Sequence, residues 1–286
     1  MSRKLVSLLL SLLLLPVSCM GEQSAEPAQE SPALSLYAIN VRKADSLLLR
    51  CGKSAYLIDT STKETVDQVL KVLSDEGITF LDGIILTHTH SDHAGGLNKL
   101  LASDLEIGKL YASRWYDKKE GKHPIEKAMK KNPSREGLET VWLSSGDTLP
   151  LDGGTLQVLG PLEASETENC NSVVLLASGG GGSMLLTGDM EFPEEASLLE
   201  AELIPQVDVL KVGNHGEEDA TGPDLIRACQ PKLAVISTKT EDERDTPHPR
   251  VLRLLAQWDV TVVQTQDAEN GVLITLENGE IRTEMK

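Results

Sequence analysis

Residues 88–93 read His-Thr-His-Ser-Asp-His and place four side chains of metal-ligand type within six positions. His88 and His90 are two residues apart, so they project to the same side of an extended chain. Asp92 and His93 follow where the chain is expected to turn into a helix. The two histidines would hold one cation, and Asp92 with His93 a second, as in two-metal hydrolytic sites. A polar loop rich in histidine by chance is disfavoured, because clustered imidazoles repel one another once protonated.

The elements before this motif are expected to present it at the end of a strand. Residues 81–86 (LDGIIL) have the composition of a buried strand and lead directly into the histidines. Residues 65–74 carry apolar side chains at helical spacing. Earlier apolar runs, separated by turn-forming residues, are typical of an antiparallel meander; they lie at 34–41, 46–50 and 55–58. Strand, helix and strand therefore lead into the motif.

The second half of the chain predicts a hairpin followed by alternating strands and helices. Apolar runs at 173–176 and 184–186 are joined by a glycine-rich segment, which we expect to be a loose turn. Further strands are expected at 207–212, 233–236 and 260–263, with helices at 223–228 and 251–258 and a last hairpin at 272–281. A meander followed by strand-helix alternation implies two sheets with helices on their outer faces.

The first nineteen residues have the pattern of an export signal. Arg3 and Lys4 precede a Leu-rich stretch that is shorter than the roughly 20 residues of a membrane-spanning helix. Ser18-Cys19 suggests a bacterial lipoprotein signal with Cys19 as the lipidated residue; ordinary secretion and an uncleaved anchor remain alternatives. We expect a signal peptide at 1–19, a disordered polar linker at 20–33 and one folded domain at 34–286. The chain would then lie outside the cytoplasm, held to the outer face of the cell membrane by a lipid anchor.

Composition limits the partners of this domain. The chain has 27 basic and 44 acidic residues and a formal charge of −17, which argues against a broad nucleic-acid-binding face. A phosphate-containing substrate is not excluded, because bound cations can reverse the local field. Three cysteines follow Cys19; one disulfide or three buried thiols are both open.

Beyond these arguments, the motif resembles the first metal motif of the metallo-β-lactamase superfamily. Within it, the chain resembles the extracellular hydrolase-type domain of ComEC, the bacterial DNA-uptake channel protein, and its stand-alone relatives. The stretches that carry this resemblance are 41–46, 57–59, 86–97 (LTHTHSDHAGGL), 171–175, 185–189 (LLTGD), 210–216 (LKVGNHG), 234–237 and 247–249. It implies an α/β protein, a four-layer αβ/βα sandwich with two mixed β-sheets and the metals at one edge.

The resemblance also implies roles for later residues. Asp189 would bridge both metals, and the alternative is a turn-forming Gly-Asp after a strand. His215 would be a later ligand, although the family usually shows two adjacent histidines where this chain has Asn214-His215. His248, which has lost a neighbouring histidine of the family pattern, would face the substrate, support a ligand or lie on the rim. Asp45 would hold a metal-bound histidine in place.

One superfamily histidine has no counterpart. The corresponding stretch is Glu-Asn-Cys-Asn-Ser at 168–172, where Asn169 could orient a water and Cys170 could be either a thiolate ligand or a buried structural residue. His123, in the charged segment 114–136, is expected at the surface.

These observations predict an exported metal-dependent hydrolase. Two divalent cations, zinc or alternatively manganese, would activate a water that Asp92 orients. The expected substrate is a phosphodiester, either a small molecule or nucleic acid; no protein partner can be inferred. A lactone, amide or β-lactam hydrolase is one alternative, and a non-catalytic binding lipoprotein with a degenerate metal site is another.

Overall fold

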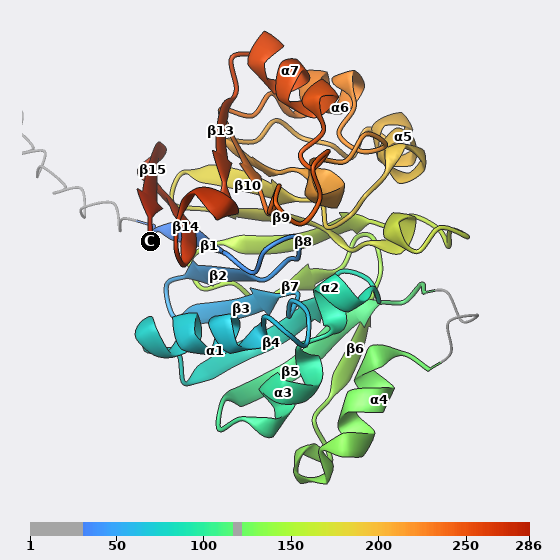
Figure 1. Cartoon of the computed structure of the whole chain (residues 1–286), viewed down its shortest axis with the longest axis vertical. Coiled ribbons are helices and arrows are strands. Elements are labelled where there is room, and N and C mark those ends of the chain that lie inside the picture. The colour runs from blue at the N-terminus through green and yellow to red at the C-terminus, as the bar shows by residue number, and fades with distance from the viewer. Residues whose placement is uncertain (1–30, 117–121) are drawn as a thin grey trace, which may run out of the picture. The chain divides into compact units, whose positions relative to one another are not determined.

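The computed structural model describes residues 31–116 and 122–286, which form two sheets flanked by helices (Figure 1). The predicted signal peptide, most of the predicted linker and Cys19 lie outside the described residues. None of the helices in the described part of the chain is both long and apolar enough to cross a membrane.

The first sheet has eight strands in the order β15-β14-β1-β2-β3-β4-β5-β6. Their bounds are β1 (Leu34–Ile39), β2 (Leu47–Cys51), β3 (Ser54–Ile58), β4 (Phe80–Leu86), β5 (Glu106–Ser113), β6 (Thr140–Leu143), β14 (Gly271–Glu277) and β15 (Glu280–Met285). The strands β1, β2 and β3 pair antiparallel, as the predicted meander requires, whereas β3 to β6 pair parallel. The parallel part places β4 inside the sheet, and the histidine motif follows directly after this strand.

The second sheet has seven strands in the order β13-β12-β11-β10-β9-β8-β7. Their bounds are β7 (Thr148–Leu149), β8 (Thr155–Gly160), β9 (Val174–Gly179), β10 (Gly182–Leu186), β11 (Val209–Lys211), β12 (Leu233–Ile236) and β13 (Thr261–Gln264). The prediction of a loose turn between β9 and β10 is wrong. The strands extend to a two-residue turn, Gly180-Gly181, with φ of 60° and 81°, which glycine adopts without steric cost.

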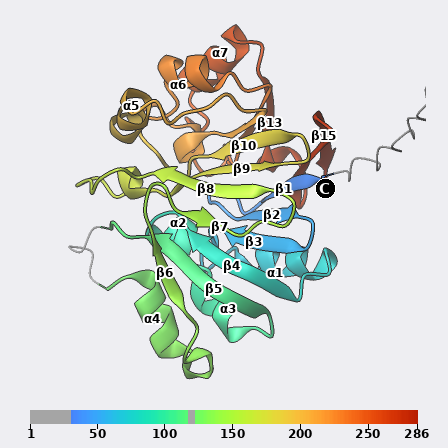
Figure 2. The ribbon, with the colours of Figure 1, turned by 180° about the vertical axis from the view of Figure 1, so that it is seen from behind.

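Helices cover both outer faces, so the predicted four-layer sandwich is confirmed (Figures 1 and 2). The helices on the first sheet are α1 (Val66–Asp75), α3 (Leu97–Ala102) and α4 (Pro124–Lys131), and those on the second are α5 (Phe192–Glu200), α6 (Pro223–Cys229) and α7 (Pro249–Gln257). One buried apolar cluster fills the space between the sheets, and one lies under each helical layer. Two rigid sheets packed in this way can hold loops from both at one edge.

The structure corrects the expected exposure of His123 and decides the state of the three cysteines. His123 was expected at the surface but is only 2% exposed. Its Nδ1 accepts a hydrogen bond from the backbone N–H of Ile125 at the start of α4, and its ring packs edge-on against Tyr116 and Trp142. The three cysteines at 51, 170 and 229 are buried free thiols, which decides against the disulfide alternative.

Candidate metal centre

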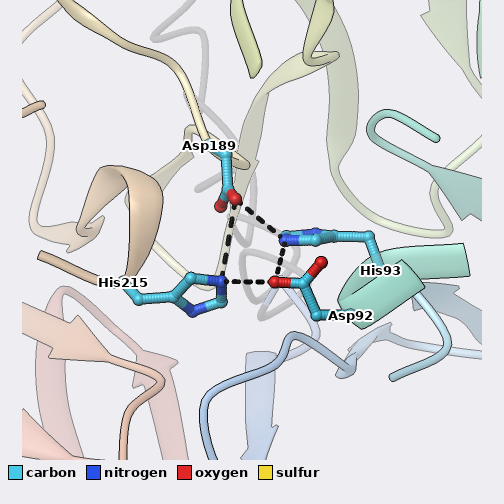
Figure 3. Close-up of side chains that lie close together, drawn as sticks. All are labelled: Asp92, His93, Asp189 and His215. Carbon is cyan, nitrogen blue, oxygen red and sulfur yellow. Dashed lines mark hydrogen bonds and ion pairs between the residues drawn. The ribbon is translucent and has the colours of Figure 1, made fainter. Parts of the chain in front are cut away.

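Four side chains of the predicted site meet where loops from both sheets converge (Figure 3). The short helix α2 (Ser91–Ala94), which follows β4, carries Asp92 and His93. Asp189 stands in the turn after β10, and His215 lies in the 3-10 helix η4 (Gly213–Gly216) after β11. Since β4, β10 and β11 are interior strands of their sheets, the loops of the site follow strands that are paired on both sides.

The ligand atoms of these four residues all lie within 4.8 Å of one another. Asp189 Oδ2 is 3.1 Å from His93 Nε2 and 3.7 Å from His215 Nε2. Asp92 Oδ2 is 3.5 Å from His215 Nε2 and 3.9 Å from His93 Nε2. Three side chains are buried, whereas that of Asp92 is 31% exposed. Two imidazoles and two carboxylates are a donor set that suits zinc and similar divalent cations.

Two atoms of this cluster need a partner that the protein itself does not supply. Asp189 Oδ1 and His215 Nε2 are buried and make no hydrogen bond. An unpaired buried polar atom is costly, and a cation between the four side chains would satisfy both atoms. The residues present therefore fit a divalent cation.

A second layer of residues fixes the two histidine rings. His93 Nδ1 lies 2.7 Å from Asp59 Oδ2, and the same carboxylate accepts hydrogen bonds from the backbone N–H and hydroxyl of Thr87. His215 Nδ1 donates to the carbonyl of Ser237 at 3.0 Å. Such contacts leave each Nε2 directed at the cluster. Asp59 was missed as a site residue; the available signal was its position directly after an expected strand, within the stretch 57–59 that carries the resemblance.

The four groups shift one another's pKa in a way that favours ion pairing. Burial alone would lower the pKa of His93 and His215, but the charge of Asp189 reverses this and raises both. Burial would raise the pKa of Asp92 and Asp189, yet the contact of Asp92 with His215 and the charge of His93 beside Asp189 lower them. These directions favour the charged forms of the histidines and carboxylates beside one another.

We expect zinc binding to weaken as the pH falls, because protons compete for His93 and His215. The pKa of both is raised above 6.5, so this competition begins above pH 6.5, and zinc binding must release protons. Titration calorimetry in buffers of different ionisation enthalpy measures that release. Affinity that stays constant from pH 8 to pH 5.5 would contradict this assignment.

His88 and His90 lie beside the cluster but do not complete a second one. Their ring nitrogens Nε2 and Nδ1 are 3.1 Å apart, and His88 Nε2 is 3.8 Å from Asp189 Oδ2. In residues 31–116 and 122–286, they form no compact group with a third His, Cys, Asp or Glu. Ser172, in the stretch 168–172 where the resemblance expects the missing histidine, places its Oγ 3.4 Å from His88 Nδ1. The cation predicted at His88 and His90 therefore has an incomplete donor set here.

Asp45 was expected to hold a metal-bound histidine in place, but its carboxylate makes no direct hydrogen bond to one. Its carboxylate forms an ion pair at 3.0 Å with Lys211, which is fully buried and also donates to the carbonyl of Val212. The backbone N–H of Asp45 donates to the carbonyl of Asp92, so Asp45 supports the metal-binding loop through the main chain. Because Lys211 is the last residue of β11 and Asp45 lies between β1 and β2, the ion pair joins the two sheets.

The remaining predicted residues lie away from the cluster. The side-chain amide of Asn169 donates to Glu191. The Cys170 thiol donates to Glu191 at 3.8 Å, and burial raises its pKa, which disfavours the thiolate form. His248 caps α7 by accepting a hydrogen bond from the backbone N–H of Arg250, and it is an ion-pair neighbour of Glu218. His215 is the surviving histidine of its pair that reaches the cluster, whereas Asn214 bonds to Asp219.

Gly188 allows the turn that presents Asp189. Its φ is +54°, and an added Cβ would come within 3.0 Å of Thr87 and 3.1 Å of Ser172. We expect Gly188→Ala to displace Asp189, lower the free energy of unfolding by about 1–3 kcal/mol and weaken zinc binding. Gly146→Ala, at a positive φ with open space around it, is the matched control. Denaturant unfolding and calorimetry give both values, and equal zinc affinity in the two variants would oppose this role.

Comparison with known proteins supports the assignment made from geometry. The family model described as the metallo-beta-lactamase superfamily matches residues 39–240. The chain belongs to the metallo-β-lactamase superfamily. ComE operon protein 3 of Bacillus subtilis is 33% identical over 211 residues, which cover 72% of this chain and 26% of that protein. Recombination protein 2 of Haemophilus influenzae is 30% identical, with coverage of 69% and 23%.

The chain thus spans about a quarter of the length of these curated relatives. Among solved structures, the metallo-beta-lactamase fold protein YhfI of Bacillus subtilis superposes with a TM-score of 0.57 at 13% identity, covering 85% of this chain and all but 1% of that one. A diphosphatase of the PhnP family superposes with a TM-score of 0.52 at 14% identity, covering 85% and 97%. At these identities the superpositions establish the superfamily fold alone. The predicted resemblance to ComEC-like members of the metallo-β-lactamase superfamily is confirmed.

Proposed function

We propose that this metallo-β-lactamase superfamily member is an exported metal-dependent hydrolase that cleaves phosphodiester bonds. The observation that carries the proposal is the buried cluster of Asp92, His93, Asp189 and His215, with ligand atoms within 4.8 Å of one another. A divalent cation held there would act as a Lewis acid and would lower the pKa of a water molecule.

The residues of the chain divide the remaining work. Asp59 and Ser237 hold the rings of His93 and His215, so the site is preorganised. Asp189 joins the two halves of the site, because it faces His93 and His215 at once and lies 3.8 Å from His88. The side chain of Asp92 is 31% exposed. Of the two carboxylates in the cluster, it is therefore the one that substrate and water can approach. We assign to Asp92 the orientation of the attacking water.

Support for a phosphodiester substrate comes from the relatives. The name of Recombination protein 2 refers to recombination, and recombination acts on nucleic acid. Basic side chains near the site are engaged: Lys43 pairs with Glu217 and Glu243, and Arg250 donates to backbone carbonyls. With these two side chains engaged and a formal charge of −17, a short or single-stranded nucleic acid, or another small phosphodiester, fits better than a long duplex.

Export and lipid anchoring rest on the sequence pattern that ends at Cys19. Labelling of expressing cells with a palmitate analogue, with Cys19→Ser beside the native chain, tests this part of the proposal. Loss of label in the variant supports an anchor, and no label in the native chain opposes it.

The substrate class is tested with purified chain loaded with zinc or manganese. Bis(p-nitrophenyl) phosphate, single-stranded DNA and a chromogenic cephalosporin are offered in parallel. We expect hydrolysis of the first two. Activity on the cephalosporin alone would replace phosphodiester by β-lactam chemistry.

The incomplete surroundings of His88 and His90 favour a second candidate, a binding protein without catalytic activity. This candidate predicts that the chain binds one cation and a phosphodiester but turns none over. Equilibrium binding of a labelled oligonucleotide, measured beside the hydrolysis assay, separates the two.

A further inference from the structure

A cavity of about 100 Å³ lies between α5 and the loop that follows β8. The two segments lie near each other in Figure 1. A cavity of this size holds several waters or a small organic molecule. Its nine lining residues include none of the four residues of the metal centre, so the cavity is a separate feature of the fold.

Glu194 on α5 lines this cavity with a buried carboxyl group that has no partner. Its side chain belongs to a residue only 5% exposed, and neither carboxyl oxygen makes a hydrogen bond. The carboxyl packs against the backbone of Gly160, where an added Cβ would lie 2.7 Å from Oε1. Burial raises the pKa of Glu194 well above its ordinary value, with no neighbouring charge contributing. An unsatisfied buried acid of this kind requires an explanation, and a ligand supplies one.

The rest of the lining indicates the chemistry of that ligand. Pro161, Leu162 and Pro193 form apolar walls, while Glu163 adds a second, exposed acid at the rim. No Lys, Arg or His belongs to the lining, so none of the lining side chains offers a positive charge to Glu194.

A divalent metal does not suit the cavity. Such an ion needs several donors close together, and the compact groups of His, Cys, Asp and Glu within the described ranges lie elsewhere, around His93. A monovalent cation with an apolar chain matches one buried carboxylate surrounded by apolar walls.

We propose that this cavity binds a primary alkylammonium ion, whose ammonium donates to Glu194 while its methylene groups pack against Pro161, Leu162 and Pro193. This site goes beyond the proposed function, and its occupancy does not require a loaded metal centre. Free amines and lysine side chains share this chemistry.

Titration calorimetry of the purified, metal-free chain tests the proposal with three probes: butylammonium, Nα-acetyl-lysine amide and neutral butanol. We expect at least one ammonium compound to bind about tenfold or more tightly than butanol, and Glu194→Gln to weaken that binding by about tenfold or more. Glu163→Gln, which removes the same charge at the exposed rim, should change affinity by less than about twofold. Butylammonium binding alone assigns free amines as the ligand source, whereas binding of the lysine derivative assigns lysine side chains. No ammonium binding, equal binding of butanol, or undiminished binding by Glu194→Gln would overturn the proposal.

Thermal unfolding gives an independent readout. Because the pKa of Glu194 is raised on folding, the folded chain holds its proton more tightly than the unfolded chain, and stability declines as the pH rises above about 4.5. The other titratable groups of the lining are Glu163 and the Cys170 thiol; both are kept in Glu194→Gln, and the thiol's raised pKa leaves it outside the acidic range of this test. This variant should unfold at higher temperature than the native chain at pH 7, and the difference should vanish below pH 4.5. Saturating ammonium should raise the unfolding temperature of the native chain only; an equal rise in Glu194→Gln would contradict the site.

Discussion

Replacing Asp189 with asparagine is expected to abolish zinc binding at the cluster and to lower kcat/KM by about 10³-fold or more. Asp189 Oδ2 lies within 3.1 Å of His93 and 3.7 Å of His215, so the change removes the negative charge on which both halves of the site converge. It also leaves the buried His93 and His215 without their counterion, because the charge of Asp189 raises the pKa of both. Metal content by mass spectrometry and hydrolysis of bis(p-nitrophenyl) phosphate measure the two effects.

The matched control is Asp224→Asn on α6, where the carboxylate is exposed and pairs with Arg227 at the surface. It makes the same chemical change, and both metal content and activity should stay at the native level. Native turnover in Asp189→Asn would remove Asp189 from the site.

The largest expected effect on folding comes from Lys211→Met. The Lys211 side chain is fully buried and forms a 3.0 Å ion pair with Asp45, itself 1% exposed. Removing one partner of a buried pair leaves an uncompensated charge, so we expect a loss of about 3–5 kcal/mol in the free energy of unfolding. Urea denaturation of the metal-free chain measures this loss.

The double variant Lys211→Met with Asp45→Leu should recover much of that loss, because both charges are gone. Lys232→Met is the surface control: its amine pairs with Asp208 at 2.7 Å, but its side chain is 67% exposed, and a change below about 1 kcal/mol is expected. If Lys211→Met cost no more than Lys232→Met, the buried pair would have no structural importance.

The parts of the fold that follow from local pattern were predictable from the sequence. The strand before the histidine motif and the two sheets with outer helices both follow from runs and periodicities within a few residues of one another. The tight turn between β9 and β10 was not, because a glycine run permits several turns and only the strand register selects one.

The site shows the same division. The motif at residues 88–93 is recognisable from residue type and spacing, whereas Asp59 and Lys211 act through partners distant in sequence. Asp59 reaches His93, 34 positions away, and Lys211 reaches Asp45 across the two sheets. His123 was misplaced for a related reason, since the aromatic rings that bury it come from two segments that meet only in the folded chain. Pairings of this kind depend on how the sheets pack, which residue spacing does not encode.

Anomalous diffraction at the zinc edge, from crystals of the native chain grown with zinc, tests the central claim most directly. The account predicts a peak bounded by Asp92, His93, Asp189 and His215, the four residues whose ligand atoms lie together. Density for a second ion between His88 and His90 would add to that site without replacing it. A peak only among Asp45, Asp59 and His93, the other compact group of such residues in the described part of the chain, or no ordered zinc at either place, would contradict the account.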